Sequence, residues 1–359
     1  MSARITRKRA RLDSNSGDPR DENGTQQASG EAHAVSESTR KRDEEFWYDD
    51  GNIILIARDV EFRVYRGILA EKSPVFSDMF SLPQPPAGSS SAPAAVADGS
   101  CPVVHLSDSP EDIRQMLRAF MPRDDMNLFL PKDPSFHTIS AAVRLGHKYQ
   151  MHTLLQQALG YLKTFYTDDI AIWSEYGEYH PPRFEDVHSI GVVNLARLTG
   201  ETSLLPRALL ACCQLGGDLI SGFEREDGTR EQITPNDMSL CFVAKTRLIH
   251  ETMKLALFAL QPAVSDDCKT AKACRRGFTR LMERVESRVD TVVGTDPFQF
   301  LQEFTRSIYK EGDWCQECYE MIHDCARDAE LSVWDRLPEI MGVPDAEWGK
   351  VDGEASGAS

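Results

Sequence analysis

The clearest pattern of apolar and polar positions lies between residues 50 and 80. A continuous apolar run from Ile53 to Ile56 predicts a strand that is covered on both faces. Residues 60–64 then alternate between apolar and polar side chains, which is typical of a half-buried strand. Ser73 and Pro74 predict a helix start, because a serine side chain caps backbone N–H groups and proline suits the first helical position. This stretch therefore predicts two strands followed by two short helices.

The remaining chain predicts one more strand and then helices. The apolar run from Val103 to Leu106 indicates the strand, and Ser109 with Pro110 indicates the start of the next helix. From about residue 167 onward, apolar residues recur almost entirely at helical spacing. The expected fold class is α+β, with a small sheet and helical hairpins followed by an all-α C-terminal domain. Helical spacing occurs at residues 113–120, 139–149, 154–165, 192–198, 204–215, 240–260, 281–289, 298–308 and 314–331.

Composition marks the boundaries between these predicted parts. Residues 1–44 are polar and poor in aromatic side chains, which predicts a disordered tail, and residues 350–359 predict a second one. Residues 83–100 are rich in Pro, Gly, Ser and Ala, so we expect a flexible insertion inside the first folded part. The sequence thus predicts a folded domain at residues 45–166 and a helical domain at residues 167–349.

Charge and targeting signals narrow the choice of partners. The formal net charge of −16 argues against nucleic-acid and membrane-surface binding, because both need clustered cations. No apolar run is long enough to span a membrane, and the N-terminus lacks the apolar segment of a secretory signal. We therefore expect a cytoplasmic or nuclear protein whose partners are other proteins, with its nine cysteines reduced.

Catalytic motifs are missing from the sequence. It contains no G-x-S-x-G, no P-loop, no G-x-G-x-x-G and no H-E-x-x-H. Acidic pairs such as Asp168 and Asp169 stand beside helix-start signals, where carboxylates cap backbone N–H groups. We therefore expect no enzymatic activity, and a hydrolase with a dispersed site is only a distant alternative.

Four cysteines form two pairs that can hold a metal. Cys268 and Cys274 form a C-x5-C pair, and Cys315 and Cys318 form a C-x2-C pair. Two pairs of thiolates match the four ligands of a tetrahedral structural zinc site. The alternative is packing, because Cys315, Cys318 and Cys325 recur at the spacing of one helix face and a buried cysteine behaves as a small hydrophobe. Zinc is the only cofactor that the sequence suggests.

Three aromatic residues, Phe46, Trp47 and Tyr48, precede the first predicted strand. They either pack against the sheet or form an exposed patch for a partner. The tryptophans of the helical domain are expected to be packing anchors between helices. They are Trp314, Trp334 and Trp348.

An ordered series of motifs, from residue 46 to about 166, resembles the BTB/POZ domain. The motifs are Phe62-x-Val64-x-Arg66, Leu69-Ala70, Ser73-Pro74-x-Phe76, Met79-Phe80, Val103-Val104-His105-Leu106-Ser107-Asp108, Phe120 and a helix pair between Ala141 and Phe165. The helical part looks like the expanded fungal branch of that family, through Trp334-Asp335-x-Leu337-Pro338 and Gly342-Val343-Pro344. The resemblance implies a small sheet covered by helical hairpins, and partner binding through dimerisation or through capture of another protein.

The chain also departs from the family pattern. Asn52 and Tyr65 stand where the family often has an acidic residue and a histidine, and a polar segment precedes Phe46, where the family's dimer form often has an extra strand and helix. Some family members recruit cullin-type ubiquitin ligases through a hydrophobic-x-Glu pattern after the third helix, but residues 121–134 contain no glutamate. The partner-binding residues that the resemblance and the aromatic cluster suggest are Phe46, Trp47, Tyr48, Asn52, Tyr65 and Arg66.

These features predict a protein–protein interaction adaptor that either self-associates or captures a partner. A nuclear, transcription-linked regulator with the same domain is the first alternative, and a substrate adaptor for a cullin-type ubiquitin ligase is the second. The nuclear alternative depends on a basic cluster that is typical of an import signal. Its residues are Arg7, Lys8, Arg9 and Arg11, with a second cluster at Arg40, Lys41 and Arg42.

Overall fold

The computed structural model describes residues 40–81, 101–121, 133–176, 179–259, 263–287, 294–311 and 314–349. All of these belong to one contact unit that spans Arg40–Ser359. The predicted import signal at residues 7–11, the predicted insertion and the predicted C-terminal tail lie outside the described residues, as does most of the loop at residues 121–134. The fold is α+β, as the sequence predicts, with a small sheet and a helical C-terminal region.

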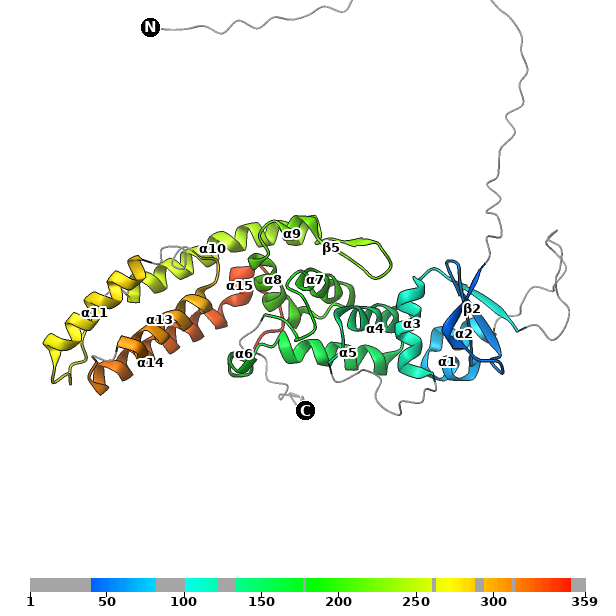
Figure 1. The fold of residues 1–359 in the computed structure, drawn as a ribbon, viewed down its shortest axis with the longest axis horizontal. Coiled ribbons are helices and arrows are strands. Elements are labelled where there is room, and N and C mark those ends of the chain that lie inside the picture. Colours follow the sequence, from blue (N-terminus) through cyan, green and yellow to red (C-terminus); the bar gives the residue numbers. More distant parts are fainter. Residues whose placement is uncertain are drawn as a thin grey trace, which may run out of the picture. The chain divides into compact units, whose positions relative to one another are not determined.

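One mixed sheet has the strand order β1-β3-β2-β4 (Figure 1). Strands β2 and β3 are antiparallel and are joined by a tight turn, in which Arg58 has a φ of 51°. Strand β1 runs parallel to β3, and β4 runs parallel to β2. The strands are β1 (Lys41–Trp47), β2 (Ile53–Ala57), β3 (Val60–Val64) and β4 (Val103–Leu106).

Strand β1 corrects one expectation, because the sequence placed Lys41–Glu44 in the disordered tail. Only Asp43 and Phe46 of this strand are buried. The Asp43 carboxylate accepts hydrogen bonds from the backbone N–H groups of Glu45 and Phe46 and forms an ion pair with Arg114 at 2.8 Å. A buried carboxylate is stable only with such partners. The strand therefore depends on a distant arginine, which a local apolar pattern does not reveal.

Helices pack around this sheet, and two of them start at the predicted capping residues Ser73 and Ser109. The Ser73 hydroxyl accepts a hydrogen bond from the Phe76 N–H at 3.0 Å and donates one to the Tyr149 carbonyl at 2.6 Å. Ser109 caps the next helix by accepting from the Asp112 N–H at 3.1 Å. The helices are α1 (Arg66–Lys72), α2 (Pro74–Ser81), α3 (Pro110–Phe120), α4 (Phe136–Lys148) and α5 (His152–Phe165).

The C-terminal region is helical apart from one short hairpin, formed by β5 (Phe223–Glu224) and β6 (Arg230–Glu231). The sequence did not predict this hairpin, because only Phe223 and Glu231 of its strands are buried. The helices are α6 (Ile170–Tyr176), α7 (His188–Thr199), η1 (Thr202–Leu204), α8 (Leu205–Gln214), α9 (Asp218–Ser221), α10 (Pro235–Ala259), α11 (Ala271–Glu286), α13 (Pro297–Glu311), α14 (Gln316–Asp335) and α15 (Leu337–Met341).

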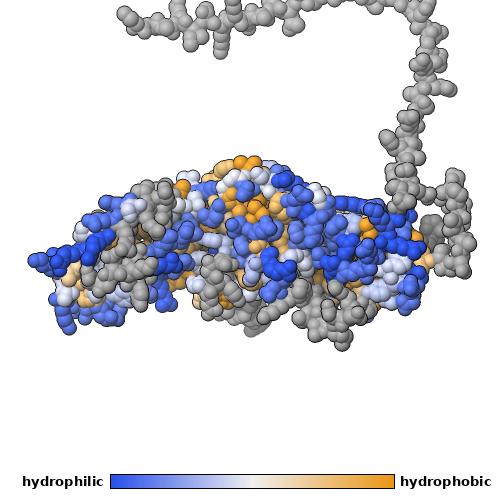
Figure 2. Space-filling view, in the orientation of Figure 1, coloured by the Kyte–Doolittle hydropathy of each residue, from blue (hydrophilic) through white to orange (hydrophobic). Residues whose placement is uncertain are grey.

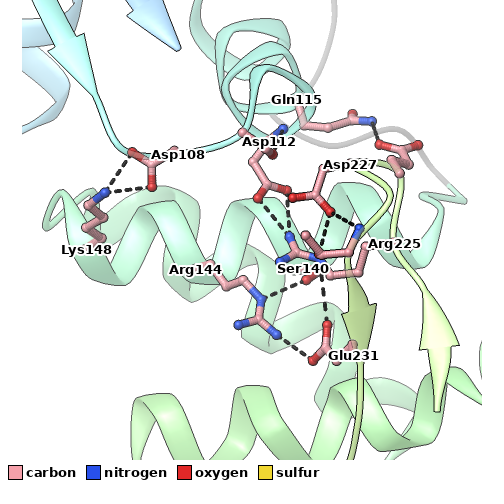
Figure 3. A network of polar contacts seen from close by, with 12 residues as sticks. Asp108, Asp112, Gln115, Ser140, Arg144, Lys148, Arg225, Asp227 and Glu231 are labelled. Carbon is pink, nitrogen blue, oxygen red and sulfur yellow. Dashed lines mark hydrogen bonds and ion pairs between the residues drawn. The ribbon is translucent and has the colours of Figure 1, made fainter. Parts of the chain in front are cut away.

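The hairpin ties the helical region to the sheet and to the helices that pack around it (Figure 3). Arg225, which follows β5, forms an ion pair with Asp112 of α3 at 2.8 Å. Glu231 of β6 accepts from Arg144 of α4 at 2.5 Å. Each of these side chains is less than a third exposed, so solvent screens the charges less than at an open surface. Beneath the hairpin, Phe223 packs edge-on against Phe136, with the ring centroids 5.3 Å apart.

The core of the helical region encloses a cation. Arg207 of α8 is completely buried, and its guanidinium has no hydrogen-bond partner among the described residues. Its Cζ lies 4.9 Å from the ring centroid of Trp173, 5.1 Å from Tyr179 and 5.5 Å from Trp334. Cation–π attraction offsets part of the cost of this burial. Trp334 is thus a packing anchor, as the sequence predicts, and only 3% of it is exposed.

Candidate metal centre

Four cysteines from two distant segments come together at one end of the helical region. Cys268 lies in the turn before α11, and Cys274 lies in the first turn of that helix. Cys315 is the N-cap of α14, and Cys318 lies in its first turn. The four Sγ atoms all lie within 4.8 Å of one another. The structure therefore brings together the two cysteine pairs that the sequence singled out. Cys268 and Cys315 are 47 positions apart in the sequence.

The distances between the sulfur atoms distinguish metal ligands from disulfides. The Sγ of Cys268 lies 3.7 Å from that of Cys274 and 3.6 Å from that of Cys315. A disulfide needs about 2.05 Å between its sulfur atoms, and all four cysteines are free thiols. Four ligands at the usual Zn–S distance of about 2.3 Å are separated by about 3.8 Å along each edge of the tetrahedron. These two separations match that edge, and all four sulfurs lie within 4.8 Å of one another, so the cluster is compact enough for a four-thiolate site.

Local backbone geometry explains how each pair converges. In the second pair, Cys315 is extended, with a φ of −70° and a ψ of 160°, and the chain enters α14 directly after it. The C-x2-C spacing places Cys318 three residues later, on the same side of this first turn. In the first pair, the Cys268 N–H donates to the Ser265 carbonyl and the Cys274 N–H donates to the Thr270 carbonyl. The first turn leads into Cys268, and the second begins the helix that carries Cys274.

Hydrogen-bond donors surround the sulfur atoms. The backbone N–H of Ser265 donates to the Sγ of Cys318 at 3.4 Å, and the N–H of Cys315 donates to the Sγ of Cys274 at 3.4 Å. The Thr270 hydroxyl also contacts the Sγ of Cys274 at 3.4 Å. Donors of this kind stabilise thiolates, which are the metal-binding form of cysteine. These contacts could not be predicted from the sequence, because two of the three groups belong to the backbone.

The pKa values of the two buried thiols shift in opposite directions. Burial opposes ionisation of Cys274, but the hydrogen bonds from Thr270 and from the Cys315 N–H outweigh it and lower its pKa. For Cys318, burial dominates and raises the pKa, although the Ser265 N–H acts against it. The cluster thus combines one thiol whose pKa is lowered with one whose pKa is raised.

Basic residues lie between the first two cysteines of the cluster and directly after them. Four thiolates around a divalent ion leave a net charge of about −2. Exposed basic side chains near the ligands in sequence reduce the electrostatic energy of that charge. They are Lys269, Lys272, Arg275 and Arg276.

An apolar contact next to the cluster fixes the two segments against each other. Trp314, the residue before Cys315, meets Phe278 of α11 edge-on, with the ring centroids 4.7 Å apart. Gly277 lets the indole ring approach closely, because a Cβ there would lie 3.2 Å from it. The packing alternative holds for Cys325, which lies outside the cluster and lines a small apolar cavity of about 190 Å³.

The predicted partner-binding residues lie elsewhere, around the start of α1. Phe46 is completely buried, so its side chain belongs to the core of the sheet unit. The rings of Tyr48 and Tyr65 lie 4.9 Å apart, and Asn52 accepts from the Arg66 N–H at 2.7 Å. Trp47 lies beneath the guanidinium of Arg42, at 4.5 Å from its ring centroid. The structure thus brings Tyr48, Asn52, Tyr65 and Arg66 together at one helix end, and partner binding there stays a prediction.

Comparison with known proteins gives no relative for this chain: no family model, no curated protein and no solved structure matches it. None of the helices in the described ranges is long and apolar enough to cross a membrane.

Proposed function

We propose that this chain is a protein-interaction adaptor whose helical region is held together by a structural zinc ion. The observation that supports the proposal is the convergence of four cysteine sulfurs to within 4.8 Å of one another, with two separations of 3.6 and 3.7 Å. Four protein thiolates complete the coordination shell of zinc and leave no open position for water or substrate. The ion therefore has a structural role, and it links the segment before α11 to the start of α14.

The adaptor part of the proposal is supported by two further observations. Residues 46 to about 166 resemble the BTB/POZ domain, a module that binds proteins. On the face shown in Figure 2, apolar side chains gather over α9 and α10. Exposed apolar residues of these helices include Ile220, Phe242 and Val243, each about half exposed. A gathered apolar surface on a folded protein is typical of a protein-interaction site.

Metal analysis of the full chain tests the zinc ion. We expect one zinc per chain after purification without chelators, and a severe loss of zinc in Cys315→Ser, because a hydroxyl is a poor ligand for this ion. Cys325→Ser is the matched control, since this residue lies on the same helix but outside the cluster. Full zinc content in Cys315→Ser, or equal loss in both variants, would contradict the proposal.

A further inference from the structure

A groove between α6, α13 and α14 has the features of a helix-binding site. Its volume is about 750 Å³. The apolar part of its lining comes from all three helices and includes Ile170 of α6, Leu301 of α13, and Ala326 and Leu331 of α14. Grooves lined by several helices receive amphipathic helices, whose apolar anchors recur every three to four residues.

The charged lining of this groove is mainly basic. Arg306, His323 and Arg327 line it and are exposed. The one acidic lining residue among the described positions is Glu330. Burial raises its pKa, and the nearby charge of Arg327 offsets only part of this increase. The whole chain has a net charge of −16, so this basic lining is opposite in sign to the rest of the protein. Such local charge selects an acidic partner.

We propose that this groove binds an acidic amphipathic helix of a partner protein. The partner's apolar face fills the floor, and its carboxylates pair with Arg306 and Arg327. This inference rests on the proposed adaptor function, because it gives the adaptor a docking surface and a class of partner.

The metal centre and the groove share one helix. The groove residues Tyr319, His323 and Arg327 of α14 follow one another at steps of four, so they lie on one helix face. This face begins directly after the ligand Cys318. A zinc ion that fixes the first turn of α14 therefore also fixes the orientation of the groove wall. The zinc-free protein is expected to bind the partner helix more weakly.

The experiment uses a fluorescent synthetic peptide of about 18 residues, with leucine and glutamate placed to form an amphipathic helix. A second peptide has lysine in place of each glutamate. A third has the first peptide's composition in an order that forms no apolar face. Fluorescence anisotropy with the full, zinc-loaded chain measures binding of each peptide, and light scattering of the protein alone shows whether a second copy occupies the groove.

Two variants change the groove. Arg306→Glu combined with Arg327→Glu reverses its charge, and Ala171→Trp fills its exposed α6 edge. The matched control is Lys72→Glu combined with Lys163→Glu, which makes the same change in net charge at exposed ion pairs on α1 and α5. Zinc content is measured for every variant.

We expect the glutamate peptide to bind about tenfold more weakly or worse to both groove variants, while the control changes its affinity by less than about twofold. Similar binding of the glutamate and lysine peptides, unchanged affinity in the groove variants, or a dimer that dissociates only when the groove is altered would overturn the inference. Metal analysis of the unmodified chain separates the two proposals. If that chain binds no zinc but groove-dependent peptide binding persists, the zinc proposal fails and the groove proposal stands. If it binds zinc but shows no groove-dependent binding, the groove proposal fails and the zinc proposal stands.

Discussion

Two helix pairs of this chain are held together in different ways. In α7 and α8, most residues are buried, so dense apolar packing fixes their positions. In α11, described buried residues are confined to Cys274, Gly277, Phe278 and Leu281, and α14 is mostly half-buried or exposed. Here the core is thin, and the four cysteine sulfurs lie within 4.8 Å of one another. If these sulfurs bind zinc as proposed, the first pair is held by packing and the second by coordination, and each would fail under different conditions.

Metal removal is expected to have the largest effect, and it tests directly whether the two helix pairs are held differently. A strong chelator should abolish hydrogen-exchange protection in α11 and the first turns of α14, because metal affinity supplies folding free energy where the core is thin. Protection in α7 and α8 should persist. Mass spectrometry of the exchanged peptides measures both pairs in one sample. Equal loss of protection in both pairs, or no loss in either, would show that the two are not held differently.

The next effect is the removal of a core ring in the packed region. Phe136 is completely buried and stacks on His188 of α7, with the ring centroids 4.5 Å apart. Phe136→Ala should lower the free energy of unfolding by about 3–5 kcal/mol, whether or not metal is present. Urea denaturation followed by circular dichroism measures it. The control is Val103→Ala, since that side chain is 42% exposed. A loss below about 1 kcal/mol would mean that packing at this point is loose.

The smallest expected effect comes from breaking the ion pair that attaches the β5–β6 hairpin to α3. Arg225→Ala should cost about 1–3 kcal/mol of unfolding free energy, because it leaves the partly buried carboxylate of Asp112 without its cation. A double-mutant cycle with Asp112→Ala isolates the pair. Lys72→Ala, which breaks an exposed pair, should change stability by less than about 0.5 kcal/mol. A coupling energy near zero would leave the hairpin's attachment to Phe223 and to the pair of Glu231 with Arg144.

Strands and helices were predictable wherever apolar periodicity alone decided the structure. Strand β2 is a continuous apolar run, and Ser73 and Ser109 cap helices through contacts within three residues. Strand β1 and the β5–β6 hairpin were missed. Their polar residues are stabilised by arginines more than 70 positions away, as with Asp43 and Arg114. Local patterns carry no information about such partners.

The candidate metal centre was half predictable. Residue type and spacing selected all four cysteines, but the spacing of Cys315, Cys318 and Cys325 also fitted one buried helix stripe. Only the tertiary fold brings Cys268 next to Cys315. The donors to the sulfurs were beyond prediction, because backbone N–H groups such as that of Ser265 carry no mark in the sequence.

The attachment of the β5–β6 hairpin has a practical consequence for dissecting this protein. A fragment that ends near residue 166 would lose Arg225, Glu231 and the ring of Phe223, and it would expose Phe136 and strip Arg144 and Asp112 of their counterions. The fragment taken alone would therefore have a newly exposed apolar surface beside unpaired charges. Any self-association of such a fragment would report the cut and not the native protein.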